Sequence, residues 1–429
     1  MGDLSHRHRK WLGWFRLLAG FGSVQMVIQV LGFLSGILIV RHLSKPDYAW
    51  FTIANSLVST LGMIADSGVS AAVSSVGGTI WQDNAQFGSL IRTALTLRRK
   101  FAILTVIVVT PIFIWLLVKN QAPGWTVAVV VSAALMGFSL QLTAGILGIV
   151  VSLRQEIRRM QSLGLAAAVL RLSLVASACL VFFDARVAVI IGLCGPGLST
   201  WFLRQWVKTS VDWNAQERSD YRSRILAVVK KQAPLTIFFC VQGQIIVWLI
   251  SIFGSEERVA EIGALGRFAM IFVVLSSVMN SIVVPRFARC QNPSVLRRRY
   301  WQVTTGFALL AGSFVALSAA FPRPLLWVLG GKYANLLDDV WLMMLSSSLA
   351  ALFATQFALT YSKAWIAPAM ISIPMEIVTQ IILIQFLDLS TVRGVLWLSF
   401  GSFIPPILLN MIIAHVELKK ASLPTEPAS

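Results

Sequence analysis

Apolar stretches of about 20 residues recur along the whole chain, and they limit its possible folds more than any other feature. Of its 429 residues, 57% are hydrophobic and only 13% are charged. A helix needs about 20 apolar residues to cross about 30 Å of hydrocarbon, where only helices and closed barrels satisfy their backbone groups. The runs have helical length, so the chain is predicted to be an all-α integral membrane protein. Twelve spans are predicted, at residues 17–40, 48–75, 101–118, 125–151, 162–183, 187–207, 233–253, 262–285, 302–321, 340–360, 364–387 and 394–416.

Basic residues are sorted between the two sides of these spans. Of the 36 Lys and Arg residues, 26 fall in alternate gaps that include both termini, and eight fall in the remaining gaps. Cytoplasmic loops carry an excess of Lys and Arg, so both termini are predicted to be cytoplasmic. An odd number of spans, or one missed early, would scramble this sorting.

Three other readings of the composition are set aside. A net charge of +18 would indicate nucleic-acid binding in a soluble chain, but basic loops are what orientation at an anionic cytoplasmic leaflet requires. The four cysteines include no pair outside the cytoplasm, so no disulfide is expected. The basic N-terminus before an apolar run imitates a signal peptide, but the run is long and no small-residue cleavage site follows, so an uncleaved first span is predicted.

The chain also divides into two similar halves of six spans. In each half, the cytoplasmic loop after the second span ends in a similar basic string, LRRKF at 97–101 and LRRRY at 296–300. We predict an N-terminal lobe at 1–207, a cytoplasmic linker at 208–231, a C-terminal lobe at 232–418 and a short cytoplasmic tail at 419–429. Two lobes with the same orientation, related by a pseudo-twofold axis along the membrane normal, are a recurring plan for transporters that open alternately to either side.

Polar side chains form a stripe on each of the first two spans. Gln25 and Gln29 lie at helical spacing with three glycines on the first span. Asn55, Ser59 and Asp66 lie at helical spacing with one glycine, Gly62, on the second. Close helix packing explains such stripes, because glycines admit a neighbour and amides bond across it. The functional alternative is that both stripes line a cleft between the lobes.

Four charged residues lie within the predicted spans: Asp66, Arg171, Arg267 and Glu376. Asp66 and Arg267 are close enough to an end for their charges to reach water. Arg171 and Glu376 lie near the midplane, on the fifth span of their halves, where a charge needs a partner or water. They are predicted to face one central cavity, as an ion pair or as substrate contacts; the alternative is two separate structural bonds.

Catalytic and cofactor functions are poorly supported. The chain has no Gly-rich phosphate loop with a following Lys and Ser/Thr, and its four histidines have no zinc-type spacing. A membrane-embedded glycan polymerase would be expected to have a large outer loop, but the longest predicted outer connection is residues 322–339. The chain is therefore expected to be neither an enzyme nor a cofactor or metal protein.

The sequence resembles the polysaccharide biosynthesis flippases, which move lipid-linked oligosaccharides and belong to the superfamily that also holds multidrug and toxin extrusion proteins. The clearest segment is 41–49 (RHLSKPDYA) followed by 65–68 (ADSG). Ile262 and Gly263, with Pro285 closing the eighth span, make a second match, and 329–333 (LGGKY) a third. Two positions depart from the family pattern. Ala49 stands where the family usually has Gly, and Gly266 and Arg267 stand where an aromatic residue is common after the Ile-Gly pair.

The resemblance implies transport of a polyprenyl-diphosphate-linked oligosaccharide from the cytoplasmic to the outer leaflet of a bacterial inner membrane. It also implies membrane lipids and other polysaccharide assembly proteins as partners. Arg267 and Arg171 are the diphosphate candidates, since Arg replaces phosphate hydration with charge-assisted hydrogen bonds. Gln25, Gln29 and Asn55 are the sugar candidates.

Two alternatives remain. A cation-coupled multidrug antiporter of the same superfamily is expected to carry a carboxylate in span 1 or span 7, and neither has one, although Asp66 or Glu376 could serve. A membrane scaffold of a glycan-assembly complex that transports nothing is the other.

Overall fold

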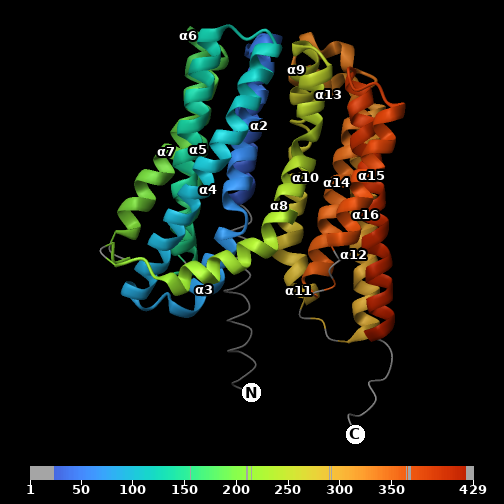
Figure 1. Cartoon of the computed structure of the whole chain (residues 1–429). Helices are drawn as coiled ribbons and strands as arrows, with labels where there is room; N and C mark the ends of the chain where they lie inside the picture. Colours follow the sequence, from blue (N-terminus) through green and yellow to red (C-terminus); the bar gives the residue numbers. More distant parts are fainter. Residues whose placement is uncertain are drawn as a thin grey trace, which may run out of the picture. The chain divides into compact units, whose positions relative to one another are not determined.

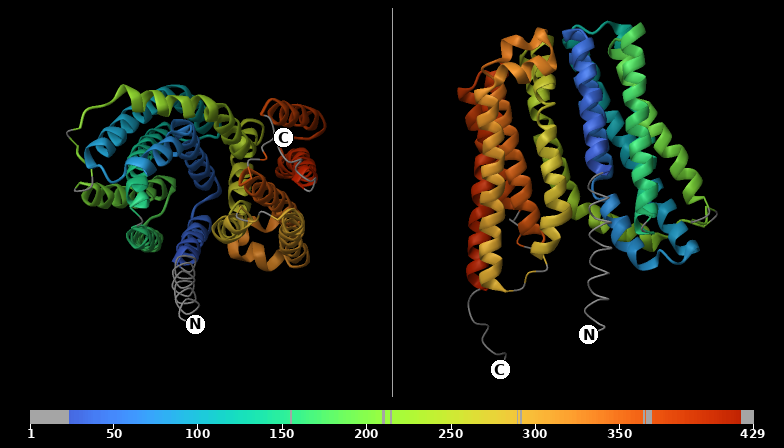
Figure 2. Two further views of the ribbon diagram at one scale, coloured as in Figure 1. Left: turned by 90° about the horizontal axis from the view of Figure 1, so that it is seen from below. Right: turned by 180° about the vertical axis from the view of Figure 1, so that it is seen from behind.

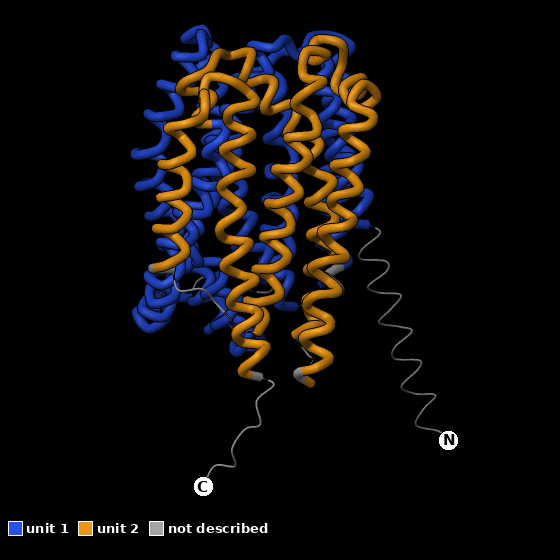
Figure 3. The backbone as a smooth tube through the Cα atoms, turned by 90° about the vertical axis from the view of Figure 1, so that its right-hand side faces the viewer, with its two compact units in different colours: residues 1–247 blue, residues 248–429 orange. Residues whose placement is uncertain are grey.

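The computed structural model describes residues 24–421, apart from 155, 209, 210, 214, 289, 291, 364 and 366–368, and these residues form helices and no strand (Figure 1). Eleven described helices are long and apolar enough to cross a membrane, and the shorter α15 (Ala369–Phe386) is the counterpart of the predicted eleventh span. The all-α membrane fold is thereby confirmed. The chain divides into two compact units, Met1–Val247 and Trp248–Ser429 (Figure 3).

The first unit contains the predicted spans 1 to 6 and most of the seventh. Its helices are Val24–His42, α2 (Lys45–Asp66), α3 (Val69–Ile80), α4 (Asn84–Lys119), α5 (Gly124–Leu153), α6 (Ile157–Val181), α7 (Ala185–Val207) and α8 (Ser219–Phe253), the last of which continues into the second unit.

The predicted second span, 48–75, is wrong as one continuous helix. The backbone turns left-handed at Ser67 (φ 36°) and Gly68 (φ 96°), which ends α2 and starts α3. Gly68 suits this position because its φ is strained for other residues, and a Cβ there would also displace the Gln232 side chain, whose Oε1 would lie 2.6 Å away. The ADSG motif is thus a helix break.

The predicted third span, 101–118, is also too short, because α4 begins at Asn84 and runs for 36 residues. Asp83 caps its start by accepting hydrogen bonds from the backbone N–H groups of Ala85 and Gln86. The LRRKF string therefore lies inside a helix and not in a loop.

Part of the predicted linker, 208–231, belongs to the core of the first unit. Tyr221, Ile225 and Val229 lie four residues apart on α8, and all three are buried in a cluster with residues of α4, α5 and α7. This spacing places them on one face of a helix. The first half of α8 accordingly lies across the ends of its neighbours in this unit (Figures 1 and 2). The predicted lobe limits themselves stay a prediction.

The second unit contains the remaining spans. Its helices are α9 (Glu256–Leu265), α10 (Met270–Val278), a π-helical turn (Met279–Val283), α11 (Val284–Ala288), α12 (Pro293–Ala320), α13 (Pro322–Leu329), a 3₁₀ turn (Gly331–Leu336), α14 (Val340–Tyr361), α15 and α16 (Val392–Ala421).

The predicted eighth span, 262–285, is interrupted. After α9 the backbone N–H groups of residues 267–272 bond three residues back, as in a 3₁₀ turn. Arg267 lies in this turn, between α9 and α10. The π-helical turn at Met279–Val283 interrupts the same span again.

The same helix pairs pack in both units. In the first, α5 packs against α2, α4 and α7, and α6 packs against α7; in the second, α14 packs against α10, α12 and α16, and α15 packs against α16. Counted in predicted spans, the fourth of each half contacts the second, third and sixth, and the fifth contacts the sixth. This agrees with a duplicated six-span unit.

Candidate polar site in the first unit

The predicted polar stripe of α2 is on the exposed face of that helix. Asn55 and Ser59 are exposed, and a Cβ on Gly62 would meet no atom within 4 Å. The opposite face is apolar and buried, with Ile53, Leu57 and Leu61 in the core. Polar groups thus line an open face that leads along α2 to Asp66.

Asp66 ends this stripe in an ion pair that the sequence did not predict. Its Oδ1 lies 3.2 Å from Nη2 of Arg98 on α4. The Ser70 hydroxyl, near the start of α3, donates a 2.5 Å hydrogen bond to the same oxygen. The carboxylate therefore has both a cation and a hydroxyl donor.

Arg98 is the more deeply buried member of the pair. Its side chain is 9% exposed, against 29% for Asp66. Gly145 on α5 makes room for it, since a Cβ there would lie 2.8 Å from Nη1. Among the described residues, no hydrogen-bond partner reaches Nε or Nη1 of Arg98. A buried guanidinium with unused donors is costly, and it calls for an explanation.

The pair lies about one membrane thickness from the far ends of its helices. Asp66 is the last residue of the 22-residue α2, and the 22 residues from Arg98 to Lys119 complete α4. At 1.5 Å per residue both distances are about 33 Å, against about 30 Å of hydrocarbon. Asp66 and Arg98 thus lie near one boundary of the hydrocarbon, the one that the charge pattern assigns to the cytoplasm.

α8 packs antiparallel against α2 in this unit. The Ser56 hydroxyl donates to Gln244 Oε1 at 2.7 Å, Cys240 Sγ lies 3.9 Å from the Thr60 carbonyl oxygen, and Gly68 faces Gln232. As the contacting residue advances along α2, its partner on α8 moves back by the same number of residues, so the two helices run antiparallel. The contact brings the predicted second span against the predicted seventh.

The predicted sugar contacts are only partly placed by these observations. Gln25 and Gln29 are partly exposed on Val24–His42, whose other face exposes Met26, Val27 and Val30. Asn55 donates its Nδ2 hydrogen to the Phe51 carbonyl of its own helix at 2.8 Å. A sugar would have to compete with that bond. Their binding role stays a prediction.

The deep charges lie in different units. Arg171 is partly buried on α6 of the first unit, whereas Glu376 is 3% exposed on α15 of the second. Arg267 is partly buried in the turn before α10. The predicted pairing of Arg171 with Glu376 and the predicted diphosphate contacts therefore stay predictions.

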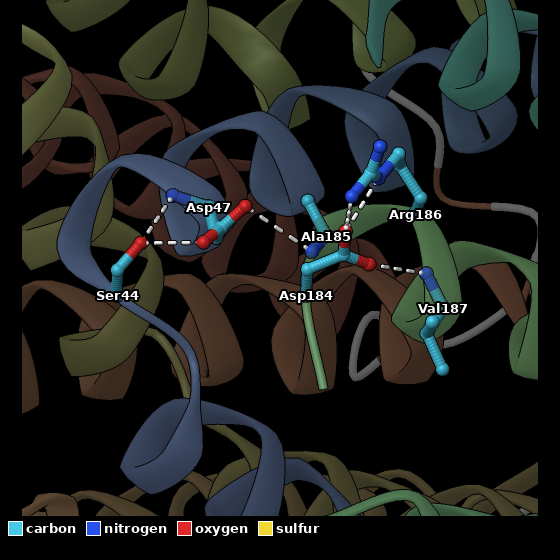
Figure 4. A network of polar contacts seen from close by, with 6 residues as sticks. All are labelled: Ser44, Asp47, Asp184, Ala185, Arg186 and Val187. Carbon is cyan, nitrogen blue, oxygen red and sulfur yellow. Dashed lines mark hydrogen bonds and ion pairs between the residues drawn. The ribbon is translucent and has the colours of Figure 1, made fainter. Parts of the chain in front are cut away.

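The RHLSKPDYA motif forms a polar clamp (Figure 4). Ser44 caps α2, and its hydroxyl donates to Asp47 Oδ2 at 2.6 Å. Asp47 Oδ1 then accepts the Ala185 backbone N–H at the start of α7 at 3.3 Å, while Asp184 accepts that of Val187 at 2.9 Å and pairs with Arg186. Two carboxylates thereby satisfy free N–H groups at one helix start.

The LGGKY motif has a similar structural role in the second unit. Gly330 (φ 106°) ends α13, and Leu329 and Tyr333 are fully buried. Asn335, two residues later, donates a 2.7 Å hydrogen bond to the buried Glu261 of α9. Both motifs therefore hold helix ends together.

Arg98 is a candidate site residue that the charge pattern of the sequence does not reveal. It belongs to a basic string with Arg99 and Lys100, but those two are exposed and Arg98 is buried. The signal was available, because Ala94, Arg98 and Ala102 continue at helical spacing the buried face of α4. As for metals, the described part of the chain contains no group of three or more His, Cys, Asp or Glu side chains that could hold an ion.

Comparisons with known proteins identify the fold. No protein-family model matches the chain, and no curated protein does. An inward-facing multidrug resistance MATE family transporter of the MOP superfamily matches with TM-score 0.68 and 15% identity, over 94% of this chain and 100% of that one. An outward-facing MATE family transporter of the superfamily matches with TM-score 0.56 and 14% identity, over 95% of each chain.

A third match is a MOP superfamily transporter from Pyrococcus furiosus, whose binding pocket is described as having reversed polarity that suggests a different function. Its TM-score is 0.57 at 13% identity, over 95% of this chain and 96% of that one. The chain thus has the fold of the MATE transporters of the MOP superfamily.

Proposed function

We propose that this chain is a membrane transporter that works by alternating access. The observation that carries the proposal is the match of nearly the whole chain to both an inward-facing and an outward-facing transporter. The duplicated helix packing supports it, because two similar halves suit a carrier that opens to either side in turn.

Asp66 is the proposed binding group for a coupling cation. It is a partly exposed carboxylate at the end of the polar stripe on α2, and Arg98 and Ser70 hold it in the structure. A proton or Na⁺ bound to Asp66 would take the place of the guanidinium. Exchange of one cation for another on a carboxylate gives a transporter two states that differ in charge.

Two classes of cargo are proposed on different grounds. The fold neighbours favour an organic compound exported by a cation-coupled antiporter, because their descriptions name multidrug resistance transporters. The sequence motifs and the cations Arg98, Arg171 and Arg267 favour a polyprenyl-diphosphate-linked oligosaccharide. The Pyrococcus neighbour supports keeping both, since one fold carries pockets of different polarity.

Reconstitution of the purified chain in vesicles tests these proposals. A labelled lipid-linked oligosaccharide that becomes accessible on the opposite leaflet supports the flippase. Uptake of a cationic dye driven by a proton or Na⁺ gradient supports the antiporter. If neither cargo moves in vesicles with correctly folded protein, the transporter proposal is wrong and a scaffold role remains.

Asp66→Asn tests the coupling site in the same vesicles. We expect transport to lose its dependence on the cation gradient. Asp220→Asn is the matched control, because Asp220 is an exposed carboxylate paired with Arg224 at the start of α8. Unchanged gradient dependence in Asp66→Asn would exclude Asp66 as the coupling group.

A further inference from the structure

We propose that Arg98 binds the phosphate of a lipid headgroup entering from the cytoplasmic leaflet, and that Asp66 occupies this site until a cation binds to Asp66. The proposal rests on the proposed transporter function and deepens it. It assigns one ion pair to two ligands of opposite charge, a cation on Asp66 and a phosphate on Arg98.

The first argument is the unused hydrogen-bonding capacity of Arg98. One guanidinium nitrogen meets Asp66, whereas Nε and Nη1 meet no acceptor among the described residues. A guanidinium presents its donors as a planar fork that binds phosphate oxygens in pairs. A phosphate that replaced Asp66 would offer more acceptor oxygens than one carboxylate does.

The second argument is depth. Asp66 and Arg98 lie about 33 Å along their helices from the opposite ends, close to the full thickness of about 30 Å of hydrocarbon. The phosphates of a leaflet lie just outside the hydrocarbon. The pair is therefore at the level where a lipid phosphate already resides, and the headgroup meets it before any part of it enters the apolar layer.

The third argument is access. Asp66 is the more exposed member of the pair, so a ligand that arrives at this end of α2 meets Asp66 first. Beyond Asp66 this face continues with Gly62, where a Cβ would meet no atom within 4 Å, and with the exposed Ser59 and Asn55. A phosphate at Arg98 would place its attached headgroup at the start of that path.

The two ligands are linked with a definite sign. A cation on Asp66 removes the counter-ion of Arg98, so it raises the affinity of Arg98 for an anion, and by reciprocity the anion raises the affinity of Asp66 for the cation. Few other charged side chains near the pair oppose this linkage. α4, α5 and α7 pack against α2, and α8 contacts it through Gln244 and Cys240. α5 has no titratable residue, and α4 presents Arg98 here but exposes Arg99 and Lys100.

The charges of the other two helices do not compete for Asp66. Near this end, α8 exposes Lys230 and Lys231. Arg204 of α7 is exposed, and the pair of Asp184 and Arg186 lies at the start of α7 beside Asp47, at the opposite end of α2. Arg98 is therefore the cation that a ligand on Asp66 displaces.

Equilibrium binding to the purified full-length chain in detergent tests the proposal without requiring transport. The probes are a fluorescent polyprenyl diphosphate, the neutral polyprenol and phosphatidylglycerol. We expect the diphosphate to bind more tightly in Na⁺ or at acidic pH than in Na⁺-free neutral buffer, and the polyprenol to show no such dependence. Removal of one charge-assisted interaction in Arg98→Gln should weaken diphosphate binding about tenfold or more.

Asp66→Asn is the decisive variant. It should bind the diphosphate at least as tightly as the cation-loaded wild type does, and without dependence on Na⁺ or pH. Asp220→Asn is the control and should keep the wild-type dependence. Displacement by phosphatidylglycerol would show a site for lipid phosphates in general, and resistance to it would show a site for the diphosphate.

Unchanged diphosphate affinity in Arg98→Gln, with the variant folded, would overturn the proposal. So would cation-dependent binding that persists in Asp66→Asn. Loss of transport with intact linked binding would instead contradict the proposed function alone, so the two failures are distinguishable.

Discussion

At the scale of single residues, the ion pair of Asp66 and Arg98 is unequal. Arg98 is nearly buried and depends on one carboxylate, whereas Asp66 is about a third exposed and also receives the Ser70 hydroxyl. Removal of one member of a buried pair costs about 3–5 kcal/mol when it leaves a buried charge alone, and less when the remaining charge reaches water. The two members should therefore respond differently to substitution.

We predict that Asp66→Asn lowers the thermal unfolding midpoint more than Arg98→Gln does. The first change leaves a guanidinium buried against Gly145, and the second leaves a carboxylate that still has Ser70 and solvent. Thermal unfolding in detergent measures both. The double variant should unfold at a higher temperature than Asp66→Asn alone, and equal midpoints for the two single variants would contradict the asymmetry.

Two aspartates outside the spans of the second unit should give opposite pH dependence. Burial, together with the nearby Asp338 and Glu261, raises the pKa of the Asp339 carboxyl above its ordinary 3.8, against the opposing effect of Arg393. Hydrogen bonds from Ser390 lower the pKa of the Asp388 carboxyl below 3.8.

The sign follows from which state binds more protons. Between 3.8 and its raised pKa, folded Asp339 holds more proton than the unfolded chain, so its contribution to stability falls as pH rises through this window. Asp388 contributes stability above pH 3.8 that is lost as pH falls through its lowered pKa.

We predict that Asp339→Asn stabilises the protein at neutral pH and flattens the slope of unfolding free energy against pH above 3.8. Asp388→Asn, its control, should flatten the slope below 3.8. Denaturant unfolding at a series of pH values measures both.

Residue types alone revealed part of the candidate site. Asp66 stood out because orientation did not explain a carboxylate in a span, and the stripe from Asn55 to Asp66 follows from helical periodicity. Arg98 was missed because a run of three basic residues reads as a loop, although only its first member lies on the buried face of α4. The pairing itself depends on how α2 and α4 pack, which no local pattern contains.

At the scale of helices, composition located most spans but not their ends. Span positions followed from apolar runs, since burial in lipid depends on residue type. The break at Ser67 and Gly68 was missed because apolar residues resume directly after it, at Val69. The extension of α4 to Asn84 was missed because its first turns are polar on one face and pack against protein on the other.

The docking of the segment after α7 onto α4 gives a prediction about a helix surface. Gly88 is buried on α4, and a Cβ there would lie 2.3 Å from the backbone oxygen of Asp212. Backbone cannot yield as a flexible side chain does, so Gly88→Ala should force the segment near Asp212 away and cost about 1–3 kcal/mol. Faster proteolysis of that segment and a lower unfolding midpoint would show this.

Gly78→Ala on α3 is the matched control. A Cβ on Gly78 would meet nothing within 4 Å, and Ala is favoured over Gly inside a helix by about 0.5–1 kcal/mol. We therefore expect Gly78→Ala to be neutral or stabilising. If Gly88→Ala behaves like Gly78→Ala, the segment does not dock against α4 as described.

At the scale of the whole molecule, the duplicated plan was predictable and the course of α8 was not. Six spans per half followed from the charge alternation and the two basic strings, and the helix pairs of each unit agree with it. The amphipathic start of α8 was read as a polar linker because charged residues surround Tyr221, Ile225 and Val229. Their spacing of four was the overlooked signal.

The packing of α8 on α2 gives a test of motion in the proposed transporter. Cys240 Sγ is 3.9 Å from the Thr60 carbonyl oxygen, and Thr60 lies one turn beyond Ser56, whose hydroxyl points to Gln244 of α8. We therefore expect a cysteine at position 60 to form a disulfide with Cys240 on mild oxidation. If transport requires the second and seventh spans to separate, as movement of two lobes implies, this link should stop it and reductant should restore it. Transport in vesicles measures the block and its reversal. Gel mobility, after the chain is cleaved between positions 60 and 240, measures the cross-link.

The background for this test is a chain in which the other three cysteines, Cys179, Cys194 and Cys290, are replaced by serine. Ser59→Cys is the matched control, because Ser59 is exposed on the other face of α2 and should not cross-link. Full transport by the cross-linked Thr60→Cys protein would mean that α2 and the first half of α8 move as one body. The moving boundary would then lie beyond Val247, where the contacts divide the chain, and not at the predicted linker.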